Sequence, residues 1–173
     1  MKKSFYLCPM KPHFYYSSDI YGINAKEIAD CCVHLICLEG GGSFVFNGKE
    51  FLLTKNCILV VPNPAKIENI NTSENSVFEW FAAPNSFLGG LLPSNNYSIG
   101  GSISLNANPV IPLSESDAQR FIDDIRRIRH RLDDSDFLFY IEIIGSLCLT
   151  MMYDTFEFHA KYYGTTQHTD RAG

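Results

Sequence analysis

Short apolar runs separated by glycine, asparagine and proline fill the first two-thirds of the chain. They predict strands at residues 31–38, 43–46, 51–54, 57–61, 67–70 and 77–83. Asn47-Gly48 lies between two of these runs and favours a tight hairpin, because both turn residues need a positive φ angle. Many short strands joined by close turns are typical of a sandwich or barrel. Residues 1–30 read as an arm with one or two short strands, and residues 93–113 as loops with an edge strand near Leu105.

From Ser114 the apolar positions recur every three and four residues, which indicates a helix. Ser114 suits the N-cap, acidic residues lie early and arginines come late, where the helix dipole favours each charge. Residues 133–136 (Asp-Asp-Ser-Asp) end this helix and cap a second one at about 137–159. The second helix is apolar nearly all round, so it must be covered on more than one side.

The pattern therefore predicts a mainly β fold with α-helices. Residues 1–113 would form a β-barrel with an N-terminal arm, and residues 114–163 a two-helix dimerisation region. Residues 164–173 would form a polar tail or linker.

Composition narrows the class of protein. The 173 residues are 46% hydrophobic, enough to build a core, and the net charge of −5 argues against a nucleic-acid surface on this chain. No signal peptide or membrane-length apolar run is visible, so we expect a cytoplasmic protein with no membrane contact. The six cysteines are then expected to be reduced and mostly buried.

The residues that could carry chemistry favour a binding protein over an enzyme. Cys31, Cys32, His34 and Cys37 are close in sequence, but on a strand they would alternate between two faces, and no CxxC pair occurs. No nucleophile motif or phosphate-binding glycine loop is present. We expect no catalytic residues, metal or cofactor. The arginines of 126–131 read as a solvated helix face.

Strand alternation also suggests a pocket. On the strand at 77–83, Phe78, Trp80 and Ala82 would line one surface, while the surface holding Glu79 would meet solvent or a partner. Aromatic walls suit small-molecule sites as well as plain cores. Inward positions on the predicted strands give the following candidate ligand-binding residues: His34, Ile36, Phe46, Glu68 and Trp80.

Residues 34–62 combine a strand, the turn Gly40-Gly41-Gly42, a short strand, Asn47-Gly48, a return strand, and an apolar strand that ends in proline. With Phe78-Glu79-Trp80-Phe81 and the two C-terminal helices, this order resembles the N-terminal domain of AraC-family transcription regulators. The resemblance implies a cupin-like jelly-roll barrel followed by two helices. It also implies an effector-sensing and dimerisation domain that binds a small organic molecule, with a sugar as one candidate. DNA would be bound only through a helix-turn-helix domain, and this chain contains no candidate for one.

Two other functions stay open. A stand-alone small cupin enzyme, an isomerase or dioxygenase, would normally carry paired metal-binding histidines, but Ile36 stands where the partner of His34 would be. A purely structural dimerisation module would have a filled barrel.

The apolar excess of the second helix predicts a homodimer. The interface is expected to use these residues: Phe121, Ile125, Ile128, Tyr140, Ile144, Leu147 and Met151.

Overall fold

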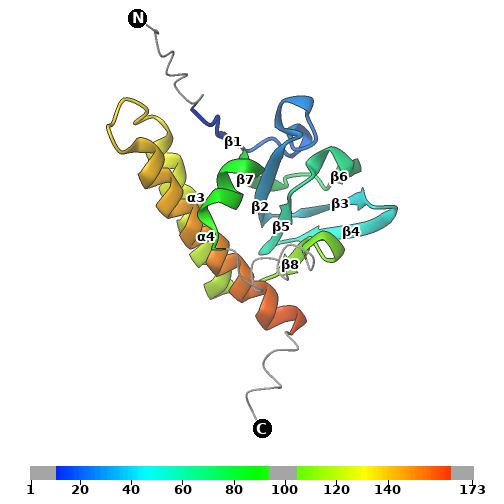
Figure 1. Cartoon of the computed structure of the whole chain (residues 1–173). Coiled ribbons are helices and arrows are strands. Elements are labelled where there is room, and N and C mark those ends of the chain that lie inside the picture. Colours follow the sequence, from blue (N-terminus) through cyan, green and yellow to red (C-terminus); the bar gives the residue numbers. More distant parts are fainter. Residues whose placement is uncertain (1–10, 94–104, 165–173) are drawn as a thin grey trace, which may run out of the picture.

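The computed structural model describes residues 11–93 and 105–164. Two β-sheets lie beside a pair of long C-terminal helices that run along one side of the β-domain (Figure 1). The strands are β1 (Tyr15–Ser17), β2 (Cys31–Glu39), β3 (Gly41–Phe46), β4 (Lys49–Thr54), β5 (Cys57–Val61), β6 (Ile67–Thr72), β7 (Val77–Pro84) and β8 (Val110–Pro112). The α-helices are α1 (Asn85–Leu91), α3 (Glu115–Leu132) and α4 (Tyr140–Tyr163), and three single 3-10 turns lie at Ile20–Gly22, Lys26–Ile28 and Pro64–Lys66.

The described strands form two separate antiparallel sheets. One has the order β1-β7-β2-β5-β8 and the other β4-β3-β6. The predicted mainly β fold with helices is thus confirmed. The predicted closed barrel is not confirmed, because the described strands form two open sheets that face each other.

The Asn47-Gly48 hairpin forms as predicted between β3 and β4. Both turn residues have positive φ angles, 52° and 74°, and Phe46 pairs with Lys49 across the turn. A two-residue loop with this backbone matches the right-handed twist of the strands that it joins.

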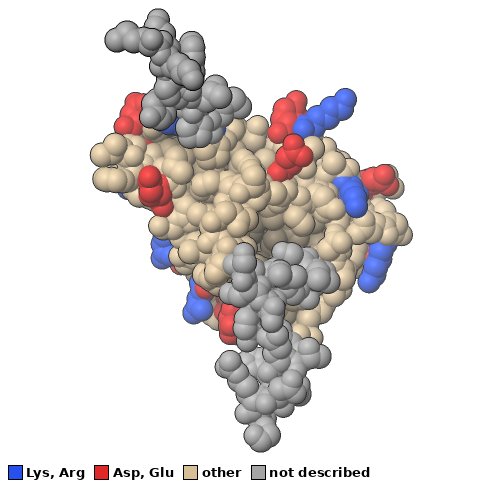
Figure 2. Space-filling model, viewed as in Figure 1, with Lys and Arg blue, Asp and Glu red and all other residues tan. Residues whose placement is uncertain are grey.

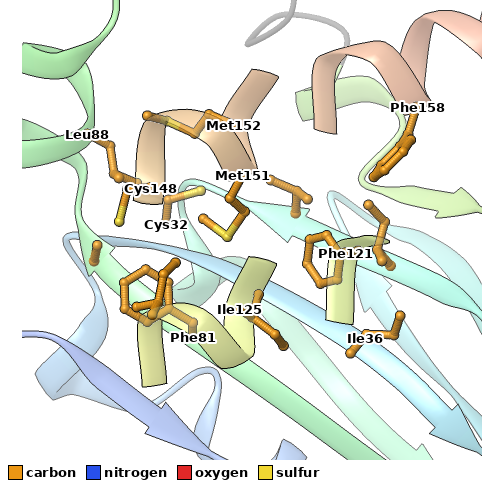
Figure 3. Packing of buried hydrophobic residues seen from close by; sticks show 14 of the residues in the cluster. Cys32, Ile36, Phe81, Leu88, Phe121, Ile125, Cys148, Met151, Met152 and Phe158 are labelled. Atoms are coloured by element: carbon orange, nitrogen blue, oxygen red, sulfur yellow. The ribbon is translucent and has the colours of Figure 1, made fainter. Parts of the chain in front are cut away.

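The five-stranded sheet has one core on each of its faces. On β2, Val33 and Leu35 point toward the three-stranded sheet, whereas Cys32, His34 and Ile36 point toward the helices. The strands on both sides of β2 alternate in the same way, so the sheet is buried from both sides. Figure 3 shows the helix-side core, where residues of β2 and β7 meet residues of α3 and α4.

Helix α3 begins where the sequence predicts. The Ser114 hydroxyl accepts a hydrogen bond from the Asp117 amide at 3.2 Å, and Asp117 and Glu115 lie in the first turn. Helix α4 begins at Tyr140 instead of Phe137, because two successive turns occupy the connector: the Phe137 amide bonds the Asp134 carbonyl, and the Tyr140 amide bonds the Phe137 carbonyl. No helix in the described ranges is long and apolar enough to cross a membrane.

Two elements were missed by the sequence analysis. Helix α1 follows Pro84, where no helix was predicted, and β8 pairs with β5 in a segment read as loop. β8 is a three-residue edge strand that ends at Pro112, and an edge position tolerates a proline. Leu105, proposed as part of an edge strand, is helical instead.

Candidate ligand pocket

A cavity of about 150 Å3 lies between the helix-facing side of the five-stranded sheet and helices α1 and α4. Strands β2 and β5 supply its floor, α1 one wall and α4 another. Its lining residues are Cys32, His34, Val60, Pro62, Asn85, Leu88, Gly89, Leu92, Leu105, Met152, Thr155 and Phe156. Cys32, Leu88 and Met152 come from three different elements and lie close together in Figure 3.

His34 is the polar group on the floor of this pocket. It sits in the middle of β2, paired with Val60 on one neighbouring strand and Phe81 on the other, and its residue surface is only 2% exposed. Its Nδ1 has no hydrogen-bond partner in the part of the chain that the structure describes. Burial lowers the pKa of the imidazole from 6.5 to about 4, so His34 is neutral at pH 7.

Two further polar side chains line the pocket. The Thr155 hydroxyl, also buried, donates a hydrogen bond to the Met151 carbonyl at 2.8 Å, which leaves its oxygen lone pairs able to accept. The exposed Asn85 amide nitrogen donates to the carbonyls of Asp30 at 3.0 Å and Pro62 at 2.6 Å. These bonds tie the start of α1 to the ends of β2 and β5, so the wall of the pocket is held against its floor.

The five ligand-binding candidates do not share one pocket. His34 lines the cavity, and Ile36 lies on the same face of β2 but is packed in the helix-side core outside the lining. Phe46 and Trp80 are buried between the two sheets, where the Trp80 indole donates to the Asp19 carbonyl at 2.8 Å. Glu68 is exposed on β6.

The sequence predicts a pocket inside the barrel that is touched by some of these five residues, and the structure brings only His34 to the cavity described here. Trp80 pairs with Leu35 across β7 and β2, and directly paired residues point to the same side of a sheet. His34 and Trp80 consequently lie on opposite faces. Sequence reasoning missed the pocket residues of α1 and α4, since α1 was not predicted and Thr155 and Met152 look like ordinary positions of an apolar helix.

The five described cysteines are all free and buried. Cys31, Cys37 and Cys57 lie between the sheets, and Cys32 and Cys148 on the helix side. Burial raises the pKa of the Cys32 and Cys148 thiols to about 12, so neither is a thiolate at neutral pH. No group of three or more potential metal ligands occurs in residues 11–93 and 105–164.

The surface of β7 that holds Glu79, predicted to meet solvent or a partner, is covered by α3 of the same chain. The Glu79 carboxylate accepts from Arg126 Nε at 3.1 Å and lies 3.8 Å from Arg129 Nη1. Burial, together with the Glu79 charge, raises the pKa of the neighbouring Tyr16 to about 12. Two arginines of the predicted solvated face thus anchor α3 to the sheet.

On the face shown in Figure 2, basic and acidic side chains are interspersed along the rim around a broad uncharged area. The described residues visible there form no basic patch of the kind that binds nucleic acid.

Six of the seven predicted interface residues are buried within the chain itself. Phe121, Ile125, Ile128, Ile144 and Met151 are completely buried in the helix-side core, and Tyr140 is 9% exposed. The sheet covers the side of α3 and α4 that carries them, and their part in a dimer interface stays a prediction. Leu147 is the one that keeps partial exposure.

No family model matches this sequence, and no curated protein matches it. Among solved structures, the crystal structure of the AraC-like transcriptional activator CuxR is similar, with a TM-score of 0.53 and 12% sequence identity. The similarity covers 86% of this chain and 48% of that one, so this chain spans about half the length of its structural neighbour. At this level of identity the likeness concerns the fold: the chain is folded like part of an AraC-like transcriptional activator.

Proposed function

We propose that this chain is the effector-sensing and dimerisation part of an AraC-type transcription regulator in the cytoplasm. A small organic molecule would bind to it, and DNA would be bound by a separate helix-turn-helix domain. The fold shared with part of an AraC-like activator supports a regulatory role over an enzymatic one. The buried free cysteines suit a reducing compartment.

The observation that carries the proposal is the position of the pocket. Its floor belongs to the β-domain and one wall to α4, so a bound molecule touches the sheet and the C-terminal helix at once. A ligand can shift a conformational equilibrium only through contacts that differ between the two states. A site on the boundary between sheet and helix supplies such contacts if α4 changes its position relative to the sheet.

Dimerisation would use the side of α3 and α4 that faces away from the sheet. Leu147 lies on α4 and keeps partial exposure, and Phe137, Leu138 and Phe139 in the connector are 55%, 86% and 62% exposed. Exposed apolar side chains that lie next to one another mark contact surfaces more often than single scattered ones do.

A fusion assay tests this function. The chain is fused to a DNA-binding domain that represses a reporter gene only when it is dimeric. We expect repression by the wild-type fusion, less repression by Leu147→Gln, and full repression by Leu52→Gln, a control at an exposed position on β4. A wild-type fusion that does not repress, at an expression level where a leucine-zipper fusion does, would contradict the dimerising role.

A further inference from the structure

The pocket between the five-stranded sheet and the helices has a size that limits its ligand. Its volume is about 150 Å3 and its walls are mainly apolar, with Val60, Leu88 and Met152 from three elements. An apolar cavity of about this volume in another protein is known to take up benzene or xenon. The space therefore suits a molecule of about one six-membered ring.

His34 gives the pocket a specific polar requirement. Buried polar groups in folded proteins nearly always have hydrogen-bond partners. His34 lines the pocket, and its Nδ1 has almost no accessible surface and no partner among the described residues, so a ligand reaches this atom only when the imidazole turns toward the pocket. A neutral imidazole nitrogen donates or accepts according to its tautomer, and a hydroxyl group can do either. The Thr155 oxygen can accept a second bond in the same space.

The described residues of the lining include no charged side chain. None of the residues that form the pocket is Asp, Glu, Lys or Arg, and His34 is neutral at pH 7. A charged ligand would lose its hydration without gaining a counter-ion. A sugar would also fit poorly, because most of its hydroxyl groups would meet apolar walls and stay unpaired.

We propose that the pocket binds an uncharged, single-ring molecule with one hydroxyl group, and that the hydroxyl bonds His34. The ring contacts the apolar side chains of β5, α1 and α4. The class of ligand is inferred from the pocket alone. The role of this ligand as an effector rests on the proposed regulatory function.

Isothermal titration calorimetry of the chain with four probes tests the ligand class. Phenol has the ring and the hydroxyl, toluene lacks the hydroxyl, benzoate is charged and glucose is a sugar. We expect phenol to bind, toluene to bind about tenfold more weakly because one hydrogen bond is lost, and benzoate and glucose not to bind.

Variants then locate the site. His34→Leu should lower the affinity for phenol to that for toluene and leave toluene binding unchanged. Gly89 lines the pocket and a Cβ added there meets no atom within 4 Å, so Gly89→Leu places a side chain at the edge of the pocket without a clash and should weaken binding of both. Gly90 is equally unobstructed but does not line the pocket, so Gly90→Leu is the matched control and should bind like the wild type. Circular dichroism is the check that all three variants fold.

Three results would overturn the proposal: no phenol binding, equal phenol affinity in Gly89→Leu and Gly90→Leu, or tighter binding of benzoate or glucose than of phenol. These results concern the chain alone. Repression by the fusion protein is measured separately, so a failed ligand class is distinguishable from a failed regulatory function.

Discussion

At the scale of single residues, burial shifts the pKa values of two ionisable side chains in opposite directions and favours the uncharged form of both. His34 is held neutral on the helix-facing side of β2, and Asp124 is held protonated between α3 and α4. Because each pKa differs between the folded and the unfolded chain, each residue makes the free energy of unfolding depend on pH, and the two dependences have opposite signs.

His34 should destabilise the fold in mild acid. Its pKa in the folded chain is about 4, below the 6.5 of an exposed histidine, so the unfolded chain binds a proton between these values and the folded chain does not. Stability conferred by this residue is present above pH 6.5 and falls by up to about 3 kcal/mol as the pH drops to 4. Urea unfolding of the wild type and His34→Leu at pH 7, 5.5 and 4 measures this. The free-energy difference between the two should widen in favour of His34→Leu, and parallel pH profiles would contradict it.

Asp124 should have the reverse effect. Burial and the neighbouring Asp154 raise its pKa to about 8 and outweigh Arg127, whose side chain lies 3.6 Å away but is 63% exposed and hence screened. Between pH 4 and 8 the unfolded chain loses this proton and the folded chain keeps it, so stability falls as the pH rises. Asp124→Asn, which resembles the protonated acid, should be more stable than the wild type at pH 8 and about equal at pH 4. Chemical denaturation at both pH values measures these free energies of unfolding. An Asp124→Asn variant that is less stable than the wild type at both would contradict a protonated Asp124 in the folded chain.

At the scale of secondary-structure elements, the attachment of α3 to β7 depends on Glu79. Its side chain is 12% exposed and pairs with Arg126 and Arg129. Glu79→Gln should lower the free energy of unfolding by about 1–2 kcal/mol, because a charge-assisted bond is lost in a partly buried setting. The control is Glu39→Gln: Glu39 pairs with Lys55 at 3.0 Å, but both side chains are more than half exposed, so this change should cost about 0.5 kcal/mol or less. Equal losses in the two variants would show that the Glu79 pair does not fix the helix.

The elements that sequence could predict are those with a strong local signal. The hairpin at Asn47-Gly48 and the cap at Ser114 depend on residues within a few positions of each other, so the sequence contains the whole signal. Strand β8 and helix α1 depend on distant partners, β5 and α4, and were missed. His34 was found as a candidate ligand residue, but the face on which it lies depends on strand register across β2 and β7, which no local pattern gives.

At the scale of the whole molecule, the five-stranded sheet divides the chain into two compartments. One core lies between the two sheets and contains Phe46 and Trp80, and the other lies under the helices and contains the cavity. Most of the apolar side chains of α4 that predict a dimer interface are buried in this second core. A molecule bound there would contact the same helix that carries Leu147 on its partly exposed side.

Methyl NMR of the chain during a phenol titration tests most directly whether the ligand site lies between sheet and helices. Val60 lines the pocket, and Leu59, its neighbour on β5, points to the opposite face into the core between the sheets. We predict that phenol shifts the methyl signals of Val60 and Met152 and leaves those of Leu59 and Leu35 unchanged. Shifts of Leu59 and Leu35 without shifts of Val60 and Met152 would place the ligand inside the β-domain and contradict the account.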